Sequence, residues 1–390
     1  MRRTLLAAAA AAALAAGLSG ASAQEKLRIG LMSTLSGPSA ALGEHMRDGF
    51  LLAVKHADGK LGGVETEVIT VDDELKPDVG VEKAKALIER DKVQVIAGVV
   101  FSNVMAAVAR PVTESEVFLV SGNAGPSVLA GKGCNPFFFS ASYQNDQMHE
   151  VMGKYAQDKG YKRMFLIAPN YQAGKDSLAG FKRHFKGEVV DEVYTQLGQL
   201  DFSAEMARIA AAKPDAVFTF MPGGMGINLV KQYRQAGLAD STPFLSAFTV
   251  DGTTLPAMKE TALGLFSSSE WTTGLENDAN RTFVADFEKE YGYVPSLYAA
   301  QGYDAAQLIG AGVKAANGDL ADKAAIRKGM EAADFPSVRG DFKMNTNHFP
   351  IQDFYLVEAA KRDDGKFDVK IVEKVFDDYG DVYAADCKMK

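Results

Sequence analysis

Short apolar strands alternate with helices through most of this chain. Residues 93–100 form an apolar, β-branched run that is typical of a strand buried on both faces. Ser102 and Asn103 follow this run, and residues 104–109 have the composition of a helix. Strands that alternate with helices in this way predict βαβ units and parallel sheets, an α/β fold.

The same strand-then-helix order occurs in both halves of the chain, with an extended run at 137–140 as a candidate crossover between two lobes. The chain is also too long for one typical core, so we expect two lobes of similar architecture. Strands are predicted at 26–32, 64–71, 93–100, 117–120, 163–168, 188–194, 216–220, 244–246, 265–270, 354–357 and 368–376. Helices are predicted at 40–56, 77–90, 146–159, 175–185, 203–212, 227–236, 278–290, 298–316 and 321–332.

The first residues have the pattern of a secretory signal peptide. Two arginines precede an Ala- and Leu-rich run, and Ala21-Ser22-Ala23 forms an A-x-A cleavage site. No Cys lies at that site, so no lipid anchor is expected there. The pattern predicts residues 1–23 as a signal peptide and an exported mature chain in a bacterial periplasm.

The net charge limits the partners expected for this chain, and the cysteine content predicts a disulfide. The formal net charge of −8 argues against nucleic acid and anionic membranes. Cys134 and Cys387 are the only cysteines, and in an oxidising compartment the simplest prediction is one disulfide that ties down the C-terminal tail. Two unpaired thiols are the alternative.

Polar and glycine-rich segments follow the predicted strands at 33–37, 100–103, 121–125, 169–174, 221–226 and 247–251. In open α/β sheets, ligands bind outside the carboxyl ends of the strands, so two facing lobes would enclose a small ligand between them. Ser102 and Asn103 begin a helix, whose free N–H groups and dipole favour an anion such as a carboxylate. The alternative is that one of these residues merely caps its own helix.

The chain resembles the leucine/isoleucine/valine-binding proteins of bacterial ABC importers, a type I periplasmic binding fold. The resemblance rests on the segments at 29–38, 95–98, 121–124 and 298–305 and covers nearly the whole mature chain. It implies two doubly wound parallel-sheet lobes joined by a three-segment hinge. Lobe boundaries are expected at 24–142 plus 272–348 for the first lobe and 143–271 plus 354–390 for the second.

The resemblance also implies where a ligand would bind. In that family a Ser after the third strand and a Thr after the fourth hold the ligand carboxylate; Ser102 matches the first position and Gly125 occupies the second, with Asn123 close by. The acidic residue that holds an amino acid's ammonium group is replaced by Thr249. A buried ammonium without an anionic partner is costly, so this replacement disfavours an amino acid.

The sequence therefore resembles the subgroup that takes up aromatic carboxylates such as benzoate or hydroxycinnamate-type acids. Ser102, Asn123 and Ala124 are expected to bind the carboxylate, and an apolar slot is expected around the ring. The full set of candidate ligand contacts is Ser36, Phe101, Ser102, Asn123, Ala124, Tyr171, Met221, Thr249 and Trp271. Phe248 and Met221 could line the same slot or belong to the core. Asp251 or Glu270 could instead supply the missing charge, which would restore a branched-chain or other amino acid as the ligand.

Signatures of other chemistry are incomplete. Gly174-Lys175 lacks the rest of a phosphate-binding loop, and none of the five His has a partner at metal-ligand spacing, so solvated or capping roles are expected for them. We expect no enzyme activity, no metal and no cofactor. The predicted partners are a small-molecule ligand and the permease of an ABC importer, with the protein itself a monomer. A receptor's ligand-sensing domain and a secreted hydrolase are the more remote alternatives.

Overall fold

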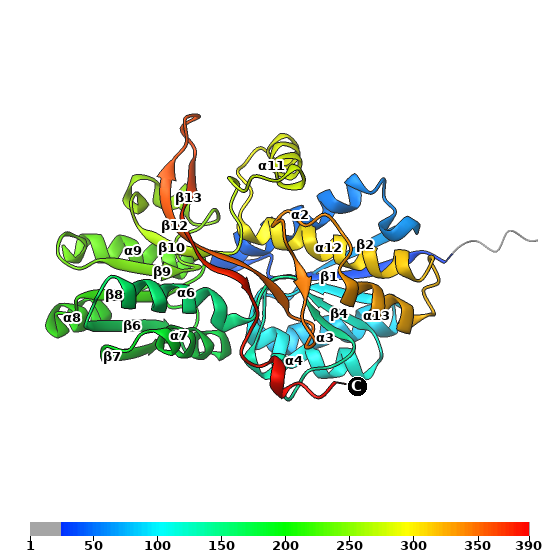
Figure 1. The fold of residues 1–390 in the computed structure, drawn as a ribbon, viewed down its shortest axis with the longest axis horizontal. Helices are drawn as coiled ribbons and strands as arrows, with labels where there is room; N and C mark the ends of the chain where they lie inside the picture. Colours follow the sequence, from blue (N-terminus) through cyan, green and yellow to red (C-terminus); the bar gives the residue numbers. More distant parts are fainter. Residues whose placement is uncertain (1–24, 390) are drawn as a thin grey trace, which may run out of the picture.

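The protein forms two lobes, each built on its own β-sheet, in a computed structural model that describes residues 25–389 (Figure 1). The first sheet has the strand order β2-β1-β3-β4-β5, and the second has the order β11-β12-β10-β9-β8-β6-β7, with β13 paired to β12. We call the half around the first sheet lobe one and the half around the second sheet lobe two. The predicted signal peptide and its cleavage site near Ala23 lie outside the described residues.

Lobe one is a parallel sheet covered by helices. Its strands are β1 (Leu27–Ser33), β2 (Thr66–Asp72), β3 (Val95–Gly98), β4 (Phe118–Ser121) and β5 (Phe138–Ser140). Its helices are α2 (Ala40–His56), α3 (Pro77–Glu89), α4 (Ser102–Glu114), α5 (Ser127–Ala130), α11 (Asp278–Tyr291), α12 (Leu297–Ala315) and α13 (Lys323–Ala332). The central strands β3 and β4 are buried along their whole length, as expected for apolar strands between two layers of helices.

Lobe two repeats this architecture and adds a long antiparallel hairpin. Its parallel strands are β6 (Arg163–Pro169), β7 (Glu188–Thr195), β8 (Ala216–Phe220), β9 (Phe244–Ala247) and β10 (Phe266–Ser269). Its helices are α6 (Asn145–Asp158), α7 (Gln172–His184), α8 (Ser203–Ala212), α9 (Gly224–Gln235) and α10 (Leu255–Met258). The hairpin consists of β12 (Pro350–Lys361) and β13 (Phe367–Tyr379), with the short β11 (Lys343–Met344) beside β12.

The α/β class is confirmed, with two lobes built on parallel sheets, and each predicted strand and helix corresponds to an element at nearly the predicted position. The largest difference is the hairpin. We predicted only 354–357 and 368–376 there, but both strands are longer because they continue as a two-stranded ribbon beyond the sheet (Figure 1).

The chain passes between the lobes in three places: from β5 to α6, from β10 to α11 and from α13 to the paired strands β11 and β12. Arg339 joins two of these segments. Its guanidinium donates to the carbonyl oxygen of Ser142 (2.9 Å) and to Oε1 of Gln352 (2.8 Å), and it forms an ion pair with Asp304 on α12 (2.9 Å). Arg339 thus ties the first and third crossing segments to a helix of lobe one.

The C-terminal tail returns from lobe two to lobe one. After β13 it reaches Cys387, which forms the predicted disulfide with Cys134 in the segment between α5 and β5. The disulfide is confirmed, and it links the two lobes covalently in addition to the three crossing segments. Within residues 25–389, no helix has the length and apolar composition needed to span a membrane.

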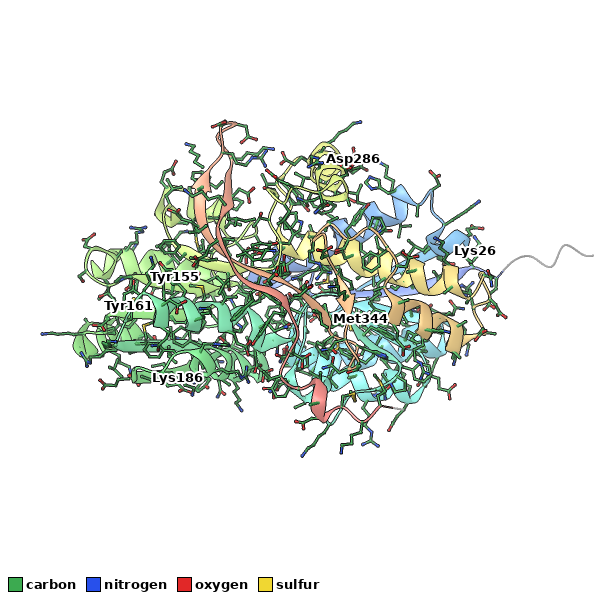
Figure 2. All side chains as sticks on the ribbon, viewed as in Figure 1. Lys26, Tyr155, Tyr161, Lys186, Asp286 and Met344 are labelled. Carbon is green, nitrogen blue, oxygen red and sulfur yellow. A yellow bond between two sulfur atoms is a disulfide. The ribbon has the colours of Figure 1, made fainter. Side chains whose placement is uncertain are left out.

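Side chains of both lobes are shown in Figure 2, where Tyr155, Tyr161 and Lys186 lie in lobe two and Lys26 and Asp286 lie in lobe one. The lobes are in direct contact. Gly223 has φ +63°, and an added Cβ there would lie 3.1 Å from the side chain of Leu42 in α2. Glycine at this position therefore permits both the left-handed turn before α9 and the close approach of the two lobes.

Candidate functional site

A cavity lies between the lobes at the carboxyl ends of the strands, where ligands bind in open α/β sheets. The space between its lining atoms totals about 330 Å³, a figure that includes space open to solvent. Residues after β3, β6, β8 and β9 contribute to its wall, together with the first crossing segment. The lining residues are Leu42, Val100, Phe101, Ser102, Asn123, Tyr143, Asn145, His149, Tyr171, Ala173, Phe220, Pro222, Phe248 and Tyr298.

Ser102 presents a hydrogen-bond donor to this cavity. It is the first residue of α4, and its side chain makes no cap to its own helix, so the capping alternative is wrong. Instead, Nδ2 of Asn145 donates to Oγ of Ser102 (3.1 Å). Because Oγ accepts that bond, its own proton is free to donate to a ligand.

The orientation of Asn145 is fixed by its other partners. The backbone N–H of Gly125 donates to Oδ1 of Asn145 (3.0 Å), so Nδ2 must be the atom that faces Ser102. The same Nδ2 also donates to Oδ2 of Asp176 on α7 (2.9 Å). Asn145 therefore holds Ser102 as a donor and connects it to lobe two.

Asn123 is positioned by a second buried pair. The hydroxyl of Tyr143 donates to Oδ1 of Asn123 (2.7 Å), and Nδ2 of Asn123 donates to the carbonyl oxygen of Val100 (2.7 Å). Burial raises the pKa of Tyr143 well above its usual value, so its phenol stays protonated as a donor. One N–H of Asn123 remains for a ligand.

Helix termini add to the donors at this end of the cavity. The first backbone hydrogen bond into α4 comes from the N–H of Met105 to Phe101, so the preceding N–H groups of the helix have no helical partner. The positive end of the α4 dipole lies at the same place, beside Ser102. No lining residue is Asp, Glu, Lys or Arg, and burial lowers the pKa of the lining His149 to about 3, so its ring is neutral at pH 7. An anion is therefore favoured over a cation, and it would be held by neutral donors.

Aromatic rings form most of the rest of the wall, beside Leu42, Ala173 and Pro222. Tyr171 lies 6.3 Å from Phe101 and 6.1 Å from Phe220 between ring centroids. Phe248 in turn lies 5.8 Å from Phe220 and 5.2 Å from Tyr143. These contacts run from lobe one to lobe two around the cavity, and they suit a flat, apolar ligand body.

Two residues beside the cavity have strained backbones. Val99 has φ +64° and Phe248 has φ +55°, both in the left-handed region that β-branched and bulky residues avoid. Such conformations cost about 1–3 kcal/mol each and persist where the surroundings require them. At Val99 the strained turn directs the chain from the end of β3 into the residues that line the cavity.

Of the nine predicted contact residues, the structure brings four together at the cavity: Phe101, Ser102, Asn123 and Tyr171. Ser36 is exposed at the start of the loop before α2. Ala124 is buried beside Asn123, and its N–H already donates to the carbonyl oxygen of Val99 (3.2 Å). Neither residue lines the cavity.

The other three predicted contacts also lie away from the cavity. Met221 belongs to the core of lobe two. The hydroxyl of Thr249 accepts from the N–H of Met221 (2.8 Å) and donates to Ala247 (3.2 Å), so it has no proton left for a ligand. Nε1 of Trp271 donates to Asn280 (2.7 Å) at the start of α11.

Neither alternative acid lines the cavity. The carboxylate of Asp251 accepts from the N–H (2.7 Å) and hydroxyl (2.6 Å) of Thr253 in its own loop. Glu270 accepts from Nε2 of Gln301 (2.6 Å). Burial raises the pKa of both carboxyl groups.

Several lining residues were not predicted. Tyr143 and Asn145 follow directly after the predicted crossover, and Phe220 ends a predicted strand. These places in the order of predicted elements could have identified them as candidate ligand contacts. His149 was expected to be solvated or to cap a helix, but it is 1% exposed because α6 buries it against lobe two. His45 and His348 are also buried, so the expectation was wrong for them too.

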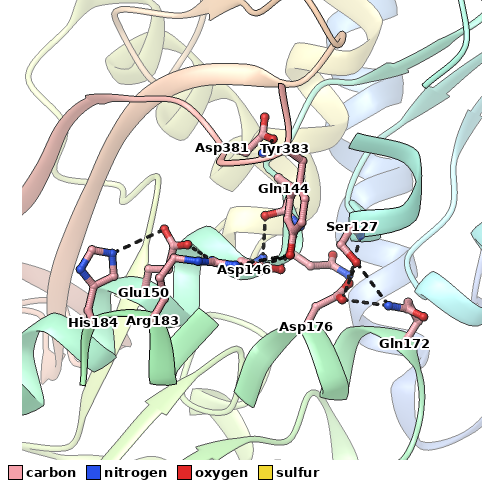
Figure 3. Close-up of polar contacts among 11 residues, drawn as sticks. Ser127, Gln144, Asp146, Glu150, Gln172, Asp176, Arg183, His184, Asp381 and Tyr383 are labelled. Atoms are coloured by element: carbon pink, nitrogen blue, oxygen red, sulfur yellow. Dashed lines mark hydrogen bonds and ion pairs between the residues drawn. The ribbon is translucent and has the colours of Figure 1, made fainter. Parts of the chain in front are cut away.

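Asp176 connects the two lobes beside the cavity. The N–H and hydroxyl of Ser127 in lobe one donate to its carboxylate (3.1 and 2.7 Å), and Gln172 donates to it from the same helix (2.8 Å). Figure 3 shows this cluster next to a second one, in which Arg183 bridges Asp146 and Glu150. Burial raises the pKa of Asp176, and the Asp146 charge acts in the same direction.

Metal ligation has no candidate site in the part of the chain that the structure describes: no group of three or more His, Cys, Asp or Glu side chains there could hold an ion.

Comparison with known proteins gives a consistent result. A family model described as periplasmic binding protein matches residues 26–366. Leu/Ile/Val-binding protein homolog 6 of Brucella melitensis is 29% identical over 367 residues, covering 91% of this chain and 93% of the relative.

Solved structures give the same assignment. A solute-binding protein of an R. palustris ABC transporter, in complex with benzoate, is 34% identical with a TM-score of 0.88, covering 93% of this chain and 100% of that one. Another from R. palustris, in complex with 4-hydroxybenzoate, is 28% identical with a TM-score of 0.85, covering 91% and 98%. The chain belongs to the periplasmic binding protein family.

Proposed function

We propose that this protein captures a small aromatic carboxylate in the cavity between its lobes and delivers it to the permease of an ABC importer. The observation that carries the proposal is the lining of the cavity. It combines an aromatic wall with the Ser102 hydroxyl and the start of α4, and it contains no charged side chain. A carboxylate would accept from Ser102, from Asn123 and from free N–H groups of α4.

The uncharged lining also separates an aromatic acid from an amino acid. An α-amino acid carries an ammonium group, which needs an anionic partner when it is buried. Asp251 and Glu270, the acids that could take this role, are engaged elsewhere and do not line the cavity. The benzoate and hydroxybenzoate complexes of the related solute-binding proteins support the same choice.

Membership of the family supports a binding role without catalysis and a periplasmic location for the working protein. We propose that residues 1–23 direct export and are cleaved after Ala23. We further propose that the lobes, bounded as predicted at 24–142 plus 272–348 and 143–271 plus 354–390, close about the three crossing segments when ligand binds. The permease would then recognise the closed form.

The test is a binding screen of the mature protein by thermal shift and calorimetry. The aromatic acids are benzoate, 4-hydroxybenzoate, 4-hydroxycinnamate and phenylpyruvate, and the amino acids are leucine, valine and glutamate. A ligand at 100 times its Kd adds about 2.7 kcal/mol to the free energy of unfolding, which raises Tm by several degrees.

Benzyl alcohol is the matched control ligand, because it keeps the ring and lacks the carboxylate. We expect shifts with aromatic acids and none with benzyl alcohol or the amino acids. A shift with leucine or valine alone would overturn the proposal.

A further inference from the structure

The cavity wall contains an imidazole ring that the carboxylate end does not use. His149 lies on α6 and is 1% exposed. It is surrounded by three phenylalanines of lobe two, with ring-centroid distances of 5.9 Å to Phe218, 5.0 Å to Phe220 and 5.9 Å to Phe248. Of these neighbours, Phe220 and Phe248 also line the cavity.

The imidazole of His149 makes no hydrogen bond within residues 25–389, and its Nδ1 is fully buried. Burial lowers its pKa to about 3, so at neutral pH the ring is uncharged, with one N–H donor and one acceptor nitrogen. Buried polar atoms are nearly always paired. An unpaired imidazole in a wall of phenylalanines, facing a ligand cavity, therefore points to a partner on the ligand.

The hydroxyls of Tyr171 and Tyr298 also line the cavity without a hydrogen-bond partner within residues 25–389, whereas the other polar side chains of the wall are paired with each other. Ser102 and Asn145 bond to each other, and Asn123 bonds to Tyr143, so these groups are directed toward the carboxylate end. Ser102 belongs to lobe one, whereas His149 belongs to lobe two. A ligand with polar groups at both ends would bond to both lobes at once, which would favour the closed form.

We propose that His149 hydrogen-bonds a hydroxyl group on the ring of the bound aromatic acid, so that the site selects hydroxylated aromatic acids over unsubstituted ones. This inference rests on the proposed function. A phenolic hydroxyl both donates and accepts, so it matches either nitrogen that His149 presents. An unsubstituted ring leaves the imidazole unpaired, which is the kind of mismatch by which sites reject an analogue that lacks a hydroxyl.

The first experiment is isothermal titration calorimetry of the mature protein with benzoate, 3-hydroxybenzoate and 4-hydroxybenzoate. We expect the better hydroxybenzoate to bind about tenfold more tightly than benzoate. In the His149→Phe variant, which keeps a ring in the same aromatic cluster, this preference should disappear, so that benzoate and the hydroxybenzoate bind with similar Kd values.

Two further variants test whether the preference belongs to His149. Tyr171→Phe and Tyr298→Phe each remove a different hydroxyl that lines the cavity. Both should keep the preference for the hydroxylated acid. If either one abolishes it while His149→Phe retains it, the assignment to His149 is overturned.

A second measurement needs no substitution. In wild-type protein labelled with ¹⁵N-histidine, binding of the hydroxybenzoate should move the His149 ring-nitrogen resonances, and benzoate should move them much less. Equal movement with both ligands, or equal affinity for both, would overturn the inference and leave the proposed function intact. Failure to bind any aromatic acid would instead overturn the proposed function itself.

Discussion

At the scale of single residues, the hydroxyl of Ser102 is the donor on which carboxylate binding depends. Replacing it in Ser102→Ala removes a hydrogen bond to a charged group, which contributes about 1.5–3 kcal/mol. We expect the affinity for the best aromatic acid to fall by about tenfold or more, with little change in Tm of the ligand-free protein. Calorimetric titration measures the first quantity and differential scanning calorimetry the second.

Ser115→Ala is the matched control for this substitution. Ser115 follows the other end of the same helix and bonds to the carbonyl oxygen of Pro111 (2.9 Å), far along α4 from the cavity. Its replacement should leave the affinity unchanged. An unchanged Kd in Ser102→Ala would show that the carboxylate lies elsewhere.

His45 makes the stability of the protein dependent on pH. Its ring is buried 4.5 Å from that of Tyr293, and burial lowers its pKa from 6.5 to about 3. As the pH falls below about 6.5, His45 takes up a proton in the unfolded chain but not yet in the folded protein. The folded state therefore loses stability in that range. Between pH 7 and pH 5 the loss from this group is about 2 kcal/mol.

The variant His45→Phe should abolish that contribution. The variant should lose less stability than wild type when the pH falls from 7 to 5. The difference between their free energies of unfolding should shift by about 2 kcal/mol in favour of the variant. Denaturant titrations at both pH values measure the difference. The control variant is Phe287→Leu, because the ring of Phe287 also neighbours His45. It should change the free energy of unfolding by the same amount at both pH values. A constant difference for His45→Phe would refute the prediction.

Sequence patterns located the carboxyl ends of the strands but not the directions of individual side chains there. Ser102 and Asn123 follow buried strands and do face the cavity. Thr249 also follows a strand, but its hydroxyl is taken up by backbone groups of its own turn. His149 was misjudged because helix α6 is buried almost all round, and periodicity does not reveal which buried ring meets a cavity.

At the scale of elements, hydrophobic periodicity predicts the bounds of a helix or strand best where the same repeat continues along the whole segment. Helix α2 begins and ends at the predicted residues, because its apolar positions and flanking loop are regular. The hairpin of β12 and β13 was only partly predicted. The strand ends that were not predicted carry charged residues such as Glu358, Lys361 and Asp377, which a solvent-exposed ribbon tolerates but which weaken the apolar signal of a strand.

Arg339 shows how one side chain supports several elements at the hinge. Its side chain is 1% exposed and Asp304 is fully buried, so Arg339→Met would leave a buried carboxylate without its cation. Losing one partner of a buried ion pair costs about 3–5 kcal/mol. We expect a loss of this size in chemical denaturation. Arg208→Met removes a surface pair with Asp191 and should cost less than about 1 kcal/mol. Equal losses in the two variants would argue against the special role of Arg339.

At the scale of the whole molecule, the bonds between Ser127 and Asp176 connect the lobes directly beside the cavity. They can form only when the lobes are together, because the two residues belong to α5 and α7 of opposite lobes. They should therefore stabilise the closed form and slow the escape of the ligand. An open form would expose both groups to water, so its free energy should depend little on the Ser127 hydroxyl.

Ser127→Ala should accordingly raise the dissociation rate of the aromatic acid by about tenfold, the effect of losing one hydrogen bond to a charged group. The association rate should change little, because encounter with the ligand precedes closure. Stopped-flow fluorescence can follow the release, since the single tryptophan, Trp271, lies just after β10 where the chain crosses between the lobes. Val128→Ala changes an exposed neighbour in the same short helix and should leave both rates unchanged. If Ser127→Ala instead slowed association with no change in release, the contact would act before closure, and the closed form would depend on the cavity contacts alone.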